Sequence, residues 1–184
     1  MEDLKLQETY STEQKILLIE DNPGDRRLIQ EMLNDITSFK YKLVTAENLK
    51  DGCELISQNA FILILLDLNL PDSTGKNTFD TILHQTKMTP VVLVSGMQNV
   101  ELSLSLIKEG AQDYIVKNEL NSTVLTRTIE FAIERKKLMS MLETKTNELE
   151  LLNSYFVNRE NRMAELKKEI NVLLEEAGKE KRYN

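Results

Sequence analysis

Residues 61–75 have the sequence Phe61-Ile-Leu-Ile-Leu-Leu-Asp67-Leu-Asn-Leu-Pro71-Asp-Ser-Thr-Gly75, an apolar run that ends in an acid and is followed by a turn. Six consecutive apolar residues are too few to cross a membrane and are typical of a strand buried on both faces. Open α/β sheets bind ligands at the carboxyl ends of such strands. The sequence therefore predicts a chemical role for Asp67, beside a loop shaped by Pro71 and Gly75.

Other short apolar segments predict four more strands, at 15–21, 41–45, 90–96 and 113–117, with helices between them. Strands and helices that alternate in this way form a parallel sheet with helices on both faces, because the crossover connections are right-handed. The apolar positions expected in the four intervening helices are Leu28, Ile29, Met32 and Leu33; Leu49, Cys53, Leu55 and Ile56; Phe79, Ile82 and Leu83; and Leu102, Leu104, Leu106 and Ile107.

Polar side chains collect at the predicted carboxyl ends of these strands. All strands of a parallel sheet point the same way, so residues far apart in the sequence should converge on one pocket at one edge. The residues expected there are Glu20, Asp21, Asp67, Ser95 and Lys117.

Crowded carboxylates repel one another and take up protons unless a cation compensates them. Carboxylate oxygens suit Mg²⁺, whereas for zinc the chain offers only His84 and Cys53 in unsuitable places. With Mg²⁺, Lys117 and Ser95 could neutralise a phosphoryl group carried on Asp67, because aspartate is a known nucleophile for aspartyl-phosphate formation. The alternative is that each acid is simply a solvated strand end.

This arrangement resembles the receiver domain of two-component response regulators. The resemblance covers roughly residues 15–136 and rests on Glu20-Asp21, Asp67-x-x-x-Pro71-x-x-x-Gly75, Ser95-Gly96 and Lys117. It implies a flavodoxin-like (βα)5 fold, a doubly wound parallel sheet with strand order 2-1-3-4-5. It also implies a signalling protein that accepts phosphate from a histidine kinase or a small phosphodonor, not an enzyme in the usual sense.

The resemblance assigns a role to each matched acid. Asp67 would be the phosphoacceptor and would also contact Mg²⁺. Asp21 would be a direct metal ligand, Glu20 would hold the metal through water or directly, and Asn69 would offer its backbone carbonyl. The family commonly has aspartate at the position of Glu20, a change that should alter the metal geometry only mildly.

It also assigns roles on the other side of the pocket. Lys117 would pair with a phosphate oxygen, Ser95 would turn toward the phosphoryl group, and Tyr114 would follow it inward. Gly96 would leave room for the phosphoryl donor. Asn118 stands where a proline usually follows the lysine, which puts the orientation of Lys117 in question.

Competing motifs fit these residues less well. A dehalogenase-type phosphatase needs a second aspartate where Asn69 stands, and a nucleotide-binding loop needs a glycine where Leu70 stands. The sole histidine, His84, is interpreted as a surface residue and not as a phosphorelay site.

A last helix is expected to begin near Thr123, after a cap formed by Asn121-Ser122, and no Pro or Gly interrupts it before Gly178. Its first turns would face the sheet through an apolar stripe. That stripe consists of Leu125, Ile129, Ala132 and Ile133.

Beyond this stripe, spacings of four and three alternate in the manner of a coiled-coil seam about 60 Å long. A parallel homodimer through residues 138–177 is the preferred interpretation, and a helix folded back on its own domain is the alternative. Lys145 and Arg159 fall in the seam and weaken it locally. The seam residues are Leu138, Leu142, Lys145, Leu149, Leu152, Phe156, Arg159, Met163, Leu166, Ile170, Leu173 and Ala177.

The composition of the chain limits the classes of protein to which it can belong. A formal net charge of -7 disfavours direct binding to nucleic acids, and the single cysteine fits a reducing cytosol. Without a signal peptide or an apolar run of membrane-spanning length, a cytoplasmic protein is expected. The expected organisation is a flexible tail at 1–14, a receiver domain at 15–136, a coiled-coil helix at 137–177 and a C-terminal tail at 178–184.

The function predicted from these features is that of a response regulator without a recognisable output domain, signalling through its C-terminal helix and protein contacts to an unidentified target. The helix after residue 138 also resembles the signalling-helix linkers of sensor kinases. A receiver-plus-linker portion of, or derived from, a larger hybrid sensor protein is therefore one alternative. A structural dimerisation module with a vestigial pocket is another.

Overall fold

The computed structural model describes residues 14–34, 40–86, 88–96 and 100–183. The chain divides into two compact units, with the boundary between Leu138 and Met139. The predicted N-terminal tail lies outside the described residues except for Gln14, which begins the first strand.

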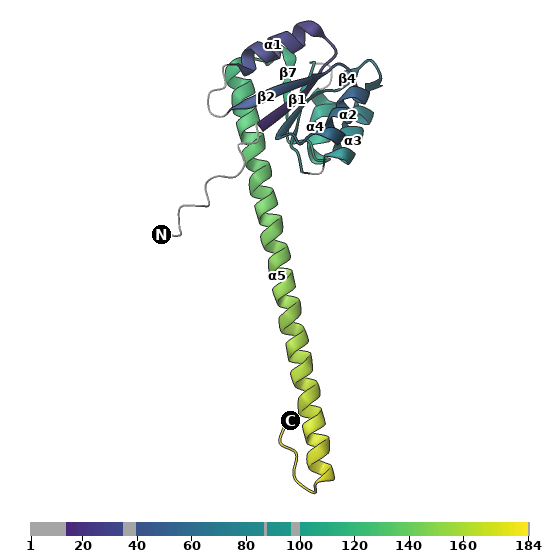
Figure 1. Cartoon of the computed structure of the whole chain (residues 1–184), viewed down its shortest axis with the longest axis vertical. Helices are drawn as coiled ribbons and strands as arrows, with labels where there is room; N and C mark the ends of the chain where they lie inside the picture. Colours follow the sequence, from purple (N-terminus) through teal and green to yellow (C-terminus); the bar gives the residue numbers. More distant parts are fainter. Residues whose placement is uncertain (1–13, 35–39, 87, 97–99, 184) are drawn as a thin grey trace, which may run out of the picture. The chain divides into compact units, whose positions relative to one another are not determined.

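The first unit is built on a five-stranded sheet whose neighbouring strands all pair in parallel (Figure 1). Its strands are β1 (Gln14–Ile19), β2 (Tyr41–Ala46), β3 (Leu63–Asp67), β6 (Val91–Ser95) and β7 (Asp113–Val116). They lie in the order β2-β1-β3-β6-β7. Counted along the chain without the two short strands β4 and β5, this is the order 2-1-3-4-5, so the predicted fold is confirmed.

Helices cover both faces of the sheet (Figure 1). One face carries α1 (Pro23–Leu33) and the first turns of α5 (Ser122–Glu176). The other face carries α2 (Leu49–Gln58), α3 (Lys76–Gln85) and α4 (Val100–Lys108). The connections between parallel strands pass through these helices, as right-handed crossovers require.

The sheet separates two apolar layers because successive side chains of a strand point to opposite faces. In β1, Ile16 and Leu18 pack toward α1 and α5, while Leu17 and Ile19 pack toward α2, α3 and α4. The same alternation holds in β3 and β6, whose side chains are buried along their whole length. This burial accounts for the unbroken apolar runs in the sequence.

The helix faces follow their apolar periods with two exceptions, of which the first is Leu28 of α1, 43% exposed. Leu125, Ile129 and Ala132 of α5 are buried against the sheet, as predicted. In α4, Leu106 is buried, whereas Leu104 is 48% exposed and lies outside the core.

A small hairpin that the sequence reasoning treated only as a turn follows the central strand. It pairs β4 (Asn69–Leu70) antiparallel with β5 (Ser73–Thr74). Asp72 at its tip accepts hydrogen bonds at 2.9 Å from the backbone N–H groups of Leu49 and Lys50, the first residues of α2. The hairpin thus caps a helix that lies far from it in the sequence.

The second unit contains the remainder of α5 and a short C-terminal segment. Gly178 has φ +69° and ends the helix in the left-handed conformation that favours glycine. The segment then folds back, and Asn171 Oδ1 accepts hydrogen bonds at 3.0 Å from the backbone N–H groups of Arg182 and Tyr183. No helix in the described ranges combines the length and the apolar character that crossing a membrane requires.

Candidate functional site

Three carboxylates meet at the carboxyl edge of the sheet. Glu20 and Asp21 follow β1 directly, and Asp67 is the last residue of the adjacent β3. One oxygen from each carboxylate lies within 4.8 Å of the other two. Glu20 is fully buried and Asp67 is 4% exposed, whereas Asp21 faces solvent.

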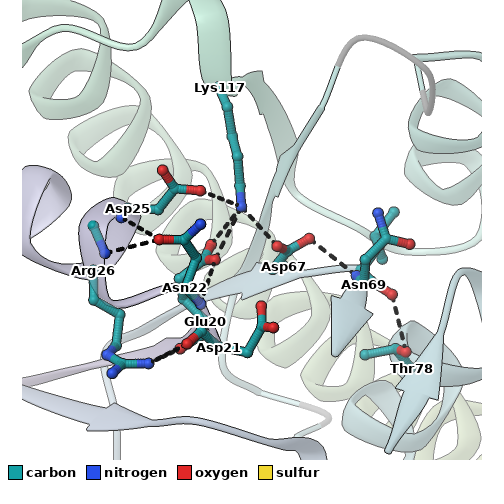
Figure 2. A network of polar contacts seen from close by, with 11 residues as sticks. Glu20, Asp21, Asn22, Asp25, Arg26, Asp67, Asn69, Thr78 and Lys117 are labelled. Carbon is teal, nitrogen blue, oxygen red and sulfur yellow. Dashed lines mark hydrogen bonds and ion pairs between the residues drawn. The ribbon is translucent and has the colours of Figure 1, made fainter. Parts of the chain in front are cut away.

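Lys117, directly after β7, points into this cluster (Figure 2). Its Nζ lies 2.7 Å from Asp67 Oδ2, 3.0 Å from Glu20 Oε1 and 2.8 Å from Asp25 Oδ2. The lysine thus reaches this position although Asn118, and not a proline, follows it in the chain.

Burial and neighbours of opposite charge act in opposite directions on the pKa values of Glu20 and Lys117. Burial raises the pKa of Glu20 to about 7; the charge of Asp67 adds to this rise and the contact with Lys117 opposes it. Burial lowers the pKa of Lys117, but hydrogen bonds to Asp25, Asp67 and Glu20 outweigh burial and leave it above its ordinary value. Lys117 is therefore a fixed positive charge among acids that repel one another.

The cluster fits a divalent cation. Glu20 Oε2 is buried and lacks a hydrogen-bond partner within the described structure, and its one recorded contact there is the ion pair with Lys117 Nζ, 2.8 Å away. A cation held between Glu20, Asp21 and Asp67 would satisfy this oxygen, and ligands that are all oxygens suit Mg²⁺.

The backbone that carries the first two acids is held from the side. Arg26 Nη1 donates to the carbonyl oxygens of Glu20 and Asp21 at 2.8 and 2.7 Å, and Nη2 donates to Glu47 Oε1 at 2.8 Å. The backbone N–H of Asn22 donates to Glu20 Oε1 at 3.2 Å. These contacts fix the direction in which the Glu20 and Asp21 side chains leave the chain.

Asp25, Arg26 and Asn22 were missed by the sequence reasoning as parts of the site. Asn22 Oδ1 caps α1 by accepting from the N–H groups of Gly24 and Asp25, at 2.8 and 3.2 Å. The turn residues do predict such a cap. They do not reveal that the first turn of α1 carries Asp25 back over the sheet edge, and no residue spacing signals this.

Asn69 lies on the other side of Asp67. Its backbone N–H donates to Asp67 Oδ1 at 3.0 Å, while Lys117 holds Oδ2 (Figure 2). Thr78 Oγ1 donates to the carbonyl oxygen of Leu68 at 3.2 Å and anchors the same loop to α3. Asp67 is therefore restrained through both carboxylate oxygens. The role of the Asn69 carbonyl as a metal ligand stays a prediction.

Ser95 follows Val94, the register partner of Asp67, and Tyr114 lies on β7, one strand further from Asp67. The structure records no hydrogen bond from either side chain to the three acids. Ser95 ends β6 and is fully buried, and its Oγ lies 3.1 Å from Ser103 Oγ on α4. Tyr114 is half-buried against the apolar layer under α2, α3 and α4. Among the described residues, no atom lies within 4 Å of the place that a Cβ on Gly96 would take.

The comparisons with known proteins agree with this geometry. The family model described as "Response regulator receiver domain" matches residues 16–130. The response regulator protein PilR of Pseudomonas aeruginosa is 32% identical over 106 residues, which cover 56% of this chain and 23% of PilR. The chain thus matches about a quarter of that relative's length.

Two further proteins match this chain over a larger share of both sequences. The cell cycle response regulator CtrA of Brucella anthropi is 29% identical over 163 residues, 83% of this chain and 68% of CtrA. A response regulator receiver domain protein from Clostridium thermocellum superposes with a TM-score of 0.61 at 25% identity, over 68% of this chain and 98% of that one.

Receiver domains are signalling proteins that bind Mg²⁺ in an acidic pocket and interact with histidine kinases. The fold, the order of strands and the acidic edge described above are those of such a domain. The chain belongs to the response regulator receiver domain family of two-component systems, and a long C-terminal helix, α5, follows the last strand of its sheet, β7.

Proposed function

We propose that this protein is a cytoplasmic response regulator that receives a phosphoryl group on Asp67 from a histidine kinase. The observation that carries the proposal is the position of Asp67 between Lys117 Nζ, 2.7 Å from Oδ2, and the two further carboxylates of the acidic cluster. A buried carboxylate next to a lysine and a cation site can bear the extra charge of a phosphoryl group.

In the proposed transfer, a carboxylate oxygen of Asp67 attacks phosphorus and a P–O bond forms. The P–N bond to the donor histidine breaks, and its electron pair stays with the imidazole. Lys117 already contacts Asp67 and would pair with a phosphoryl oxygen. Bound Mg²⁺, held by Glu20, Asp21, Asp67 and the Asn69 carbonyl, would supply positive charge for the other phosphoryl oxygens.

Ser95 and Tyr114 would transmit the effect of phosphorylation from Asp67 to the neighbouring helices. Ser95 would turn its hydroxyl toward the phosphoryl group, and Tyr114 would move into the space that this opens. Both stand on strands next to α4 and α5. The surface formed by α4, β7 and α5 would repack, and α5 includes the residues of the predicted coil.

The output would be protein contact through a parallel homodimer of residues 138–177. Its support is a seam of apolar side chains that the single chain leaves exposed, such as Leu142, 69% exposed, and Phe156, 61% exposed. Such a stripe is stabilised when a second helix covers it. Lys145 interrupts the apolar seam. Its Nζ lies 2.7 Å from Glu148 Oε2, so its acidic partner comes from the same helix.

Beryllofluoride, a mimic of the phosphoryl group, tests the proposal. It should bind the protein with Mg²⁺ and fail to bind with EDTA, and Asp67→Asn should abolish binding. Asp72→Asn is the matched control, because Asp72 is an exposed acid of the neighbouring hairpin. Binding that survives Asp67→Asn would refute the assignment of the phosphoacceptor.

A second candidate is the receiver-plus-linker portion of, or derived from, a larger hybrid sensor protein, supported by α5, which continues from the receiver unit to Glu176 as a linker helix would. A dimerisation module with a vestigial pocket is the candidate of another class. Labelling with acetyl phosphate separates the two, because a vestigial pocket would stay unlabelled while a receiver of either origin would not.

A further inference from the structure

Two hydroxyl groups contact each other in the interior of the receiver unit. Ser95 Oγ, at the end of β6, lies 3.1 Å from Ser103 Oγ, on α4, and both residues are fully buried. Buried hydroxyls need partners, because an unpaired polar group in the interior destabilises the fold. One of the two hydroxyls donates to the other, so this contact gives each serine a hydrogen-bond partner.

The pair lies one residue away from the phosphoacceptor in the register of the sheet. Asp67 of β3 pairs with Val94, and the next residue of β6 is Ser95. On its other side Ser95 pairs with Val116, the residue before Lys117. Ser95 thus stands between the strand ends that carry Asp67 and Lys117, while its hydroxyl is engaged with α4.

We propose that Ser103 is a positioning residue that holds the Ser95 hydroxyl on α4 until Asp67 is phosphorylated. The inference rests on the proposed function. Ser95 has one proton to donate, and phosphoryl oxygens can only accept. A change of the Ser95 rotamer moves Oγ by about 2 Å, so the movement that brings it to the phosphoryl group takes it away from Ser103.

The switch therefore has a defined cost in the wild-type chain. When Ser95 turns to the phosphoryl group, the buried hydroxyl of Ser103 is left without its partner. With alanine at position 103 the phosphorylated state carries no such orphan, and in the resting state it is Ser95 that lacks a partner. Both effects favour the phosphorylated state.

Ser103→Ala should consequently tighten binding of beryllofluoride in saturating Mg²⁺ by about three- to tenfold, the equivalent of one net hydrogen bond. Ser103→Cys should act in the same direction while nearly keeping the side-chain volume, which separates the lost bond from a cavity. Ser105→Ala is the matched control. Ser105 lies on the same helix, is exposed, and donates to the carbonyl oxygen of Leu102 at 2.7 Å. Its removal should leave the affinity unchanged.

A double-mutant cycle identifies the route of the effect, because in a Ser95→Ala background the change at Ser103 should no longer alter the affinity. An unchanged affinity in Ser103→Ala and Ser103→Cys would overturn the inference, as would the same tightening in the Ser95→Ala background. Wild-type protein that does not bind beryllofluoride with Mg²⁺ would instead remove the proposed function on which the inference rests.

Discussion

Lys117 Nζ lies 2.8 Å from Asp25 Oδ2, which joins the end of the last strand to the first turn of α1 across 92 residues of sequence. The contact is less buried than those with Glu20 and Asp67, since the Asp25 side chain is 35% exposed. Asp25 and Asp67 contact the Lys117 ammonium from opposite sides (Figure 2).

Replacing Asp25 by asparagine should lower the free energy of unfolding by about 1 kcal/mol, measured by urea denaturation in EDTA, because a charge-assisted hydrogen bond is lost at a partly solvated position. The same substitution in a Lys117→Met background should have little effect. An equal loss in both backgrounds would show that Asp25 stabilises α1 without acting through the lysine.

Magnesium should stabilise the folded chain, because the acidic cluster exists only when Glu20, Asp21 and Asp67 are brought together. At about 100 times the dissociation constant the gain is about 2.7 kcal/mol, read from urea denaturation with and without the ion. Asp21→Asn should remove most of this gain, while Asp72→Asn should retain it. A full Mg²⁺ response in Asp21→Asn would place the ion elsewhere.

Asp72 should contribute to stability in a pH-dependent way. Slight burial raises its pKa, but the hydrogen bonds from Leu49 and Lys50 N–H outweigh this and hold the pKa below the ordinary 3.8. A group with a lowered folded-state pKa stabilises the fold above its unfolded value and loses that contribution as the pH falls through the folded value.

Asp72→Asn should thus cost roughly 1 kcal/mol at pH 7, as the loss of a helix cap does. The difference from wild type should close as the pH falls below 3.8. Glu54→Gln on the same helix is the control: its carboxylate accepts from the Gln58 side chain, and its stability should follow that of the wild type. A constant difference at all pH values would contradict the capping role.

The proposed coil can be tested with two adjacent leucines. Leu151 and Leu152 are 56% and 52% exposed, yet only Leu152 lies in the predicted seam. Leu152→Ala removes one seam leucine from each chain of the homodimer, so it should weaken dimerisation by about 2–4 kcal/mol, roughly thirty- to a thousandfold. Leu151→Ala should change it little. Sedimentation velocity provides the measurement, and equal effects of the two substitutions would refute the seam.

Much of the fold follows from the sequence because burial on two faces leaves unbroken apolar runs, as in β3 and β6. The acidic edge follows as well, since parallel strands bring Glu20, Asp67 and Lys117 to one side. Both predictions depend on periodicity and topology, which a single sequence displays directly.

The missed contacts depend on how a turn or a helix is directed in space. Nothing in the order of residues states that α1 aims Asp25 at Lys117, or that Ser103 of α4 lies over Ser95. Leu104 shows the same limit, because its apolar character placed it in a core from which the helix face excludes it. To predict such contacts, one must know the angle at which each helix or turn lies against the sheet.

Arg26 grips the carbonyl groups behind Glu20 and Asp21, so these acids are aimed at Asp67 by the main chain itself. The repulsion between these like charges is therefore overcome by the fold itself, through the main chain and through Lys117. A cation bound at the cluster would relieve that repulsion, so the affinity for the ion and the lower stability of the ion-free cluster would have the same physical origin.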